Sequence, residues 1–136
     1  HVRLLMPGAG SLHYAFGGLS ILGRAAGPQA RDPFASIATL ADRHPLRIVG
    51  TDRARRHVAW FLDHLGAEGS AWHANGVNAS AITMTGQVVP VFAYPDALAI
   101  LERLGGGPIA VVTFDRFRDF SGGLCVAGLR RRGLDV

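Results

Sequence analysis

The chain has 136 residues, of which 49% are hydrophobic, so it is long and apolar enough for a single domain with its own core. Its formal net charge of +4 comes from 14 basic residues, all of them arginine, which is more typical of a GC-rich bacterial genome than of a surface selected for nucleic acid. Its one cysteine, Cys125, excludes an internal disulfide and predicts a reducing, cytoplasmic compartment.

We divide the predicted domain, residues 1–136, into an irregular N-terminal segment and a regular body. Residues 1–31 are rich in glycine, and their short apolar runs are compatible with hairpins or with a bent helix. The nearly uncharged stretch Leu4–Gly23 is more apolar than one small core readily covers. It predicts either a homo-oligomer formed through this stretch or contact with a missing part of a longer protein. No stretch reaches the roughly 20 apolar residues that cross a bilayer, so no membrane span is expected.

Helix and strand signals alternate in the body, residues 32–136. A helix is predicted over 32–42, where an aspartate and a proline begin the segment, and the apolar run Leu46–Gly50 predicts a short strand. A second helix is predicted over 51–65 because apolar residues recur there every three or four positions. The next strand is predicted at Ser70–Ala74.

Residues 75–86 are ambiguous between a short helix and a strand over Ala79–Thr85, and we favour the helix. The run Val88–Tyr94 predicts a buried strand because it is β-branched and aromatic without polar alternation. A proline then begins a helix predicted over 95–104, and Ile109–Phe114 predicts a further buried strand.

Helical signals return at 115–120, are interrupted by the pair Gly122-Gly123, and resume over 124–132. The alternation of strands and helices from Leu46 onward is typical of a parallel sheet with helices on its faces. We therefore predict an α/β fold with a small, mostly parallel sheet flanked by helices. The alternative is an α+β fold in which hairpins pack on helices, and it depends on the two ambiguous regions.

Two parts of the body resemble each other. Pro33–Arg55 and Pro95–Arg118 share a proline-initiated helix, a proline-initiated strand and an Asp-Arg step, in that order. An internal duplication would produce this layout and would predict paired, equivalent sites. Any two helix–strand units share part of the pattern, so both interpretations stay open.

Two segments resemble known families. VFAYPDALAILERLGGGPIAVVTFDRF resembles the strand–helix–strand segment shared by the copper accessory proteins of nitrous-oxide reductase and the organomercurial lyases. Those families bind metal through cysteine-rich motifs, which this sequence lacks, so the resemblance implies their fold unit without their metal chemistry. HVAWFLDHLGAEGSAWHANGVNASAITMTGQVVPVFAY resembles the soluble C-terminal α/β domain of some bacterial membrane glycosyltransferases.

The first candidate ligand site is a stripe on the helix predicted over 51–65. Its residues recur three or four apart on the face opposite the apolar one, and they are Arg53, Arg56, His57, Trp60 and His64. Arginines in the first turn oppose the helix macrodipole, which favours an anionic partner there. The tryptophan ring can stack on another ring or on a guanidinium. The alternative is a solvated face without a ligand.

The second candidate ligand site is a glycine-rich turn that contains Gly8, Gly10, Ser11 and His13. Glycines let backbone N–H groups approach an anion closely, and the serine and histidine add donors. The turn lacks the Gly-Lys-Ser/Thr of a P-loop and also suits a plain connection between strands. No HxxH or HExxH spacing occurs, so no metal site is predicted, and the sequence indicates no particular cofactor.

Asp52 and Asp115 are weak catalytic candidates. Each follows a predicted strand, at the carboxyl end where open α/β sheets bind ligands, but each also suits a helix cap. The sequence has no GxSxG motif, and Cys125 lies in an apolar segment rather than beside an activating base.

These observations favour a non-catalytic binding or accessory module for a small anionic ligand or a protein partner. One alternative is a small enzyme with its site at the carboxyl ends of the strands. The other is a nucleic-acid-binding protein that uses the arginine-rich helix face together with Arg130–Arg132.

Overall fold

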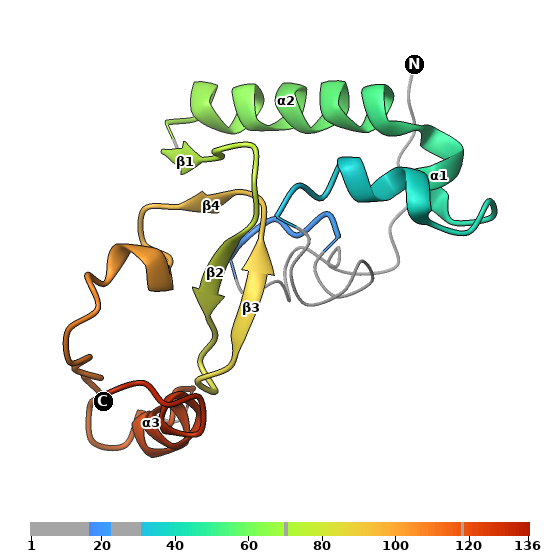
Figure 1. Cartoon of the computed structure of the whole chain (residues 1–136). Helices are drawn as coiled ribbons and strands as arrows, with labels where there is room; N and C mark the ends of the chain where they lie inside the picture. The colour runs from blue at the N-terminus through green and yellow to red at the C-terminus, as the bar shows by residue number, and fades with distance from the viewer. Residues whose placement is uncertain (1–16, 23–30, 70, 118) are drawn as a thin grey trace.

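The structure is a computed structural model that describes residues 17–22, 31–69, 71–117 and 119–136 (Figure 1). Its elements in chain order are the 3-10 helix η2 (Ala35–Thr39), α1 (Pro45–Val49), α2 (Thr51–Ala67), β1 (Trp72–His73), β2 (Ala79–Ile82), β3 (Val88–Val91), β4 (Tyr94–Pro95), the 3-10 helix η3 (Leu101–Arg103) and α3 (Gly122–Arg130). The strands form two antiparallel pairs, β1 with β4 and β2 with β3. No parallel pair occurs within the described ranges, so the predicted α/β fold is wrong. The arrangement is α+β, which was the alternative.

The hairpin of β2 and β3 occupies the region that the sequence left ambiguous. Its turn is closed by a hydrogen bond of 2.8 Å from the Thr83 N–H to the Gln87 carbonyl. Gly86 holds a φ of 70° in this turn, a left-handed conformation that costs other residues about 1–2 kcal/mol. The helix favoured over 75–86 is therefore wrong, because pairing with β3 satisfies more of the backbone of β2 than one helical turn would.

The other edge of β2 is covered by residues 99–102. The Ile82 N–H donates to the Ala99 carbonyl at 2.9 Å. Both carboxylate oxygens of Glu102 lie 3.0 Å from the Ser80 nitrogen, which donates to them. The hairpin is thus flanked by a segment that the sequence predicted to be helical.

Two predicted elements after β3 are not formed. The helix predicted over 95–104 is reduced to η3, because Ile100 is buried against β2 instead of lying on a helical stripe. Ile109–Phe114, predicted as a buried strand, runs without a strand partner in the described part of the chain. The two segments that resemble each other in sequence differ in structure, since Pro33–Arg55 contains η2, α1 and the start of α2, whereas Pro95–Arg118 contains η3 and no α-helix in its described residues.

The helix predicted over 51–65 is confirmed as α2. Ala54 is buried, and Val58 and Leu62 follow at helical spacing and pack on the same core. The buried members of that core besides Ala54 are Leu22, Phe34, Ile37, Phe92 and Ala93. In Figure 1, α2 runs along one side of the molecule and covers η2 and β1. None of the helices in the described ranges combines the length and the apolarity needed to traverse a bilayer.

α1 stands where the sequence predicted the strand Leu46–Gly50. Pro45 occupies its first turn, where the missing N–H has no intrahelical partner to lose. Nδ1 of His44 caps the helix by accepting from the Leu46 N–H at 3.2 Å. Ile48 is 72% exposed, whereas Leu46 packs against the core, so the run is split between two faces of a helix instead of entering a sheet.

α3 begins at the glycine pair that was predicted to interrupt a helix, and the helix predicted over 115–120 is not formed. The hydroxyl of Ser121 caps its N-terminus. Gly128 lies against the hairpin turn so closely that a Cβ atom there would sit 2.3 Å from the Thr85 carbonyl oxygen. This contact holds α3 at the far end of the hairpin from α2 (Figure 1).

Candidate functional site

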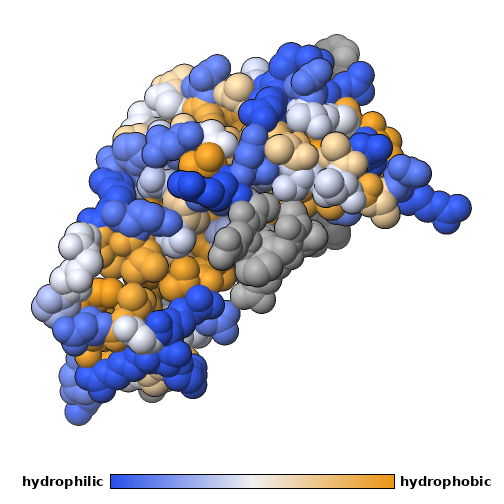
Figure 2. Space-filling view, viewed as in Figure 1, coloured by the Kyte–Doolittle hydropathy of each residue, from blue (hydrophilic) through white to orange (hydrophobic). Residues whose placement is uncertain are grey.

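An apolar hollow with a volume of about 830 Å³ lies between the hairpin and α3. In Figure 2, apolar side chains gather in the lower part of the view, where Figure 1 places the hairpin turn and α3. Four segments far apart in the sequence supply most of its walls. The lining residues, which define the apolar hollow, are Gly17, Ile82, Thr83, Met84, Thr85, Ala97, Leu98, Ala99, Leu104, Ile109, Ala110, Val111, Val112, Phe120, Cys125 and Leu129.

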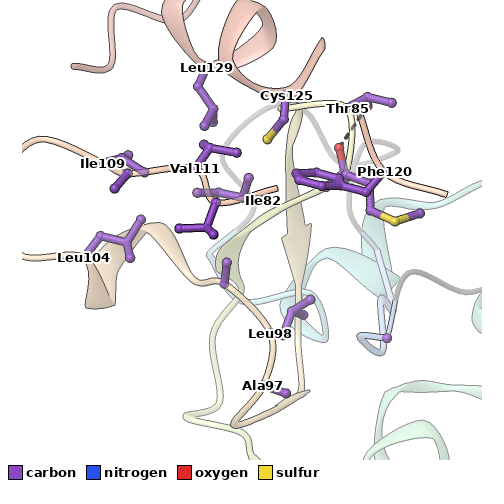
Figure 3. A pocket seen from close by; sticks show the side chains of 16 residues that line it. Ile82, Thr85, Ala97, Leu98, Leu104, Ile109, Val111, Phe120, Cys125 and Leu129 are labelled. Carbon is purple, nitrogen blue, oxygen red and sulfur yellow. Dashed lines mark hydrogen bonds between the residues drawn. The ribbon is translucent and has the colours of Figure 1, made fainter. Parts of the chain in front are cut away.

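The side chains that line the apolar hollow come from different directions toward one space. In Figure 3, Ile109 and Val111 of the extended segment lie near Ile82 of β2, with Leu104 beside them. Cys125 and Leu129 of α3 approach the same space from the helix side. The close approach of α3 to the hairpin turn, which the glycines permit, is what positions these two walls.

The lining of the apolar hollow carries little acid–base chemistry. Among the described residues that line it there is no carboxylate, imidazole or guanidinium group, and the polar side chains are two threonines and the buried thiol of Cys125. The hydroxyls of Thr83 and Thr85 bond to each other at 3.1 Å (Figure 3). In the described part of the chain, no three His, Cys, Asp or Glu side chains are arranged to hold a metal ion. A concave, mostly apolar surface of this kind suits binding of apolar groups.

The predicted ligand stripe lies on the exposed face of α2. All five of its side chains are exposed, namely Arg53, Arg56, His57, Trp60 and His64. The rings of Trp60 and His64 stack with centroids 5.3 Å apart and an interplanar angle of 12°. The anionic ligand of this stripe stays a prediction.

The two weak catalytic candidates belong to different parts of the molecule. Asp52 lies in the first turn of α2, and Asp115 follows the extended segment, 3.7 Å from the neighbouring guanidinium of Arg116. Both aspartates are exposed, and neither lines the apolar hollow. The sheet edge that was expected to bring them together is not formed. The second predicted ligand site, with Gly8, Gly10, Ser11 and His13, lies outside the described residues.

A polar cluster that the sequence did not predict joins β1 to the turn after β4. Nε2 of His73 lies 2.5 Å from Oδ1 of Asp96, and Nη1 of Arg103 lies 3.5 Å from the same oxygen. Pairing of β1 with β4 sets His73 opposite Tyr94, and their ring centroids are 5.7 Å apart. The hydrogen bond and charge of His73, assisted by Arg103, lower the pKa of Asp96 below its ordinary value. No sequence motif marks this cluster, because only strand pairing brings its members together.

We expect replacement of Asp96 by asparagine to change how stability depends on pH. Because the pKa of Asp96 is lowered in the folded state, the ionised carboxylate stabilises the fold above its unfolded pKa of about 4. That stabilisation is lost as the pH falls through the lowered pKa. Urea unfolding of wild type and Asp96→Asn should therefore differ at neutral pH and converge in acid. Asp63→Asn on the exposed face of α2 is the matched control, and a difference for Asp96→Asn that stayed constant with pH would contradict the assignment.

The described residues form a mixed α+β fold with an apolar hollow between the hairpin and α3. Comparison with known proteins finds similarity to the B subunit of a probable anaerobic glycerol-3-phosphate dehydrogenase from two strains of Halobacterium salinarum, each 33% identical over 103 residues. The match covers 76% of this chain but 24% of each relative, so the chain spans about a quarter of the length of the curated relatives that it matches. No family model matches the chain, and the two resemblances noted in the sequence gain no support from one. No solved structure matches it either.

Proposed function

We propose that the chain is a non-catalytic accessory module that binds a protein partner through the apolar hollow. The observation that carries this proposal is a concave surface of about 830 Å³ whose described lining residues are mostly apolar and include no ionisable side chain except the thiol of Cys125. Hollows of this character bind by excluding water from apolar groups. A lining without carboxylate, imidazole or guanidinium offers little for acid–base catalysis.

The similarity to the two Halobacterium salinarum proteins supports a polypeptide, rather than a small molecule, as the occupant. These relatives are named as subunits of a dehydrogenase, and the matched region is only about a quarter of their length. The proposed partner is therefore the polypeptide region that corresponds to the rest of these relatives, whether or not it continues this chain, in an oxidoreductase assembly. An anionic ligand on α2, a nucleic acid, a catalytic role and a homo-oligomer remain predictions from sequence.

A chimera tests the proposed function. We expect the Halobacterium salinarum protein to fold when this chain replaces the segment that it matches. The rest of that protein would then supply the surface that the apolar hollow is proposed to bind. Met84 lines the hollow and is 63% exposed in the isolated chain, so a charge there is tolerated until a partner covers it. Met84→Glu should lower the yield of folded chimera about tenfold or more, since burying an unpaired charge costs more than the 1.4 kcal/mol of a tenfold change.

Ile48→Glu is the matched control for Met84→Glu. Ile48 is similarly exposed but lies on α1, outside the hollow lining. Size-exclusion chromatography and circular dichroism would measure the yield of folded chimera. A wild-type chimera that fails to fold, or equal losses for the two variants, would contradict the proposed function.

A further inference from the structure

Ile109–Phe114 is a segment outside any strand pair, and most of its backbone amides have no hydrogen-bond partner among the described residues. The Ile109 N–H donates to the Asp135 carbonyl at 2.8 Å, which ties the segment to the end of the described chain. Beyond that bond, the N–H groups of Ala110–Phe114 donate no hydrogen bond to any described residue. The segment therefore presents a row of unpaired amide donors, as an edge strand does, although its last carbonyl, that of Phe114, accepts from the Phe117 N–H at 3.3 Å.

Two large apolar side chains of the same segment are exposed to solvent, and a bound partner would bury them. Val112 is 75% exposed and Phe114 is 74% exposed, and their spacing of two places them on one side of an extended chain. Ile109 and Val111, also two apart, are more buried and line the apolar hollow, which Val112 lines as well. The composition of the segment, β-branched and aromatic, is that of a strand that packs on both faces.

The segment is also held in place by α3. A Cβ atom at Gly122 would lie 2.9 Å from Cγ2 of Thr113, so the extended chain packs closely on the first turn of that helix. The segment is thus fixed at both ends, by Asp135 near its start and by Gly122 near its end. Because the extended segment is already fixed by these two contacts, it loses less conformational entropy on pairing than a free peptide would.

We infer that Ile109–Phe114 docks by strand addition to an extended segment of the partner polypeptide, the one that corresponds to the rest of the Halobacterium salinarum relatives. The length of the relatives outside the match supplies the polypeptide for this role. Strand addition uses backbone hydrogen bonds for affinity and alternate side chains for fit, and this segment presents both. The inference rests on the proposed function and extends it from the apolar hollow to its bordering strand.

Amide hydrogen exchange tests the inference in the isolated chain and in the chimera described above. The amides of Ala110–Phe114 should exchange rapidly in the isolated chain and about 100-fold or more slowly in the chimera, because pairing protects them. Phe114→Lys, at an exposed position outside the hollow lining, should leave the thermal unfolding midpoint of the isolated chain unchanged and lower that of the chimera by several degrees. Ile48→Lys, at a similarly exposed position on α1, should alter neither.

The possible results of these experiments distinguish strand addition from the proposed function. A chimera that folds and is sensitive to Met84→Glu, but leaves these amides unprotected, would overturn strand addition and leave the proposed function standing. A chimera that does not fold would remove both. Slow exchange in the isolated chain at high concentration would indicate pairing with a second copy, and it would overturn the choice of partner.

Discussion

Replacement of Gly128 by alanine is expected to detach α3 from the hairpin and to lower the free energy of unfolding by about 3 kcal/mol. The added Cβ would lie 2.3 Å from the Thr85 carbonyl oxygen and 2.9 Å from the Gly86 Cα atom. Both neighbours are backbone atoms of a tight turn, so neither can move aside as a flexible side chain would. Urea unfolding followed by circular dichroism would measure the loss.

Gly123→Ala is the matched control for Gly128→Ala. It lies in the same helix, and its Cβ would meet no atom within 4 Å. Removal of a glycine from a helix should therefore stabilise the protein by about 0.5–1 kcal/mol. If Gly128→Ala were as stable as Gly123→Ala, the packing of α3 on the hairpin turn would be refuted.

Replacement of Phe34 by alanine is expected to lower the free energy of unfolding by about 3–5 kcal/mol, a large part of the 5–15 kcal/mol of a typical domain. Phe34 is 2% exposed, and its ring meets that of Phe92 edge to face with centroids 5.1 Å apart. The guanidinium carbon of Arg55 lies 4.4 Å from the centre of the same ring, so the substitution also removes a cation–π contact.

Phe117→Ala is the control for the loss of Phe34, because it removes the same side chain from an exposed position. It should cost less than about 1 kcal/mol, since little buried area is lost. Thermal unfolding of the two variants would separate the effects. A small effect of Phe34→Ala would show that the core beneath α2 is not formed as described.

α2 could be predicted from sequence because local and tertiary preferences agree there. Its apolar residues recur at helical spacing, and the same residues, such as Ala54, Val58 and Leu62, pack on the core. The run from Leu46 to Val49 lacked that agreement, since four apolar-rich residues suit a helix or a strand equally well. Pro45 and the cap from His44 decide in favour of α1.

The segment from Pro95 to Leu104 shows a local signal that a long-range contact overrides. Its proline and its apolar spacing predicted a helix, but Ile100 bridges to Ala81 on the edge of β2. A hydrogen-bonded neighbour far away in the sequence leaves no trace in local periodicity. The apolar hollow was unpredictable for the same reason, because its walls come from segments that only the fold brings together.

Glu102 has a consequence for how the protein behaves at high concentration. Partial burial alone would raise its pKa, but the hydroxyl and amide of Ser80 lower that pKa, and the carboxylate stays charged at neutral pH. A foreign strand that approached β2 would have to displace this anion from the amide that it needs. The charge therefore acts as a gatekeeper against edge-to-edge aggregation of the hairpin. No described carboxylate accepts from the amides of Ala110–Phe114, and this is the segment that we propose for strand addition.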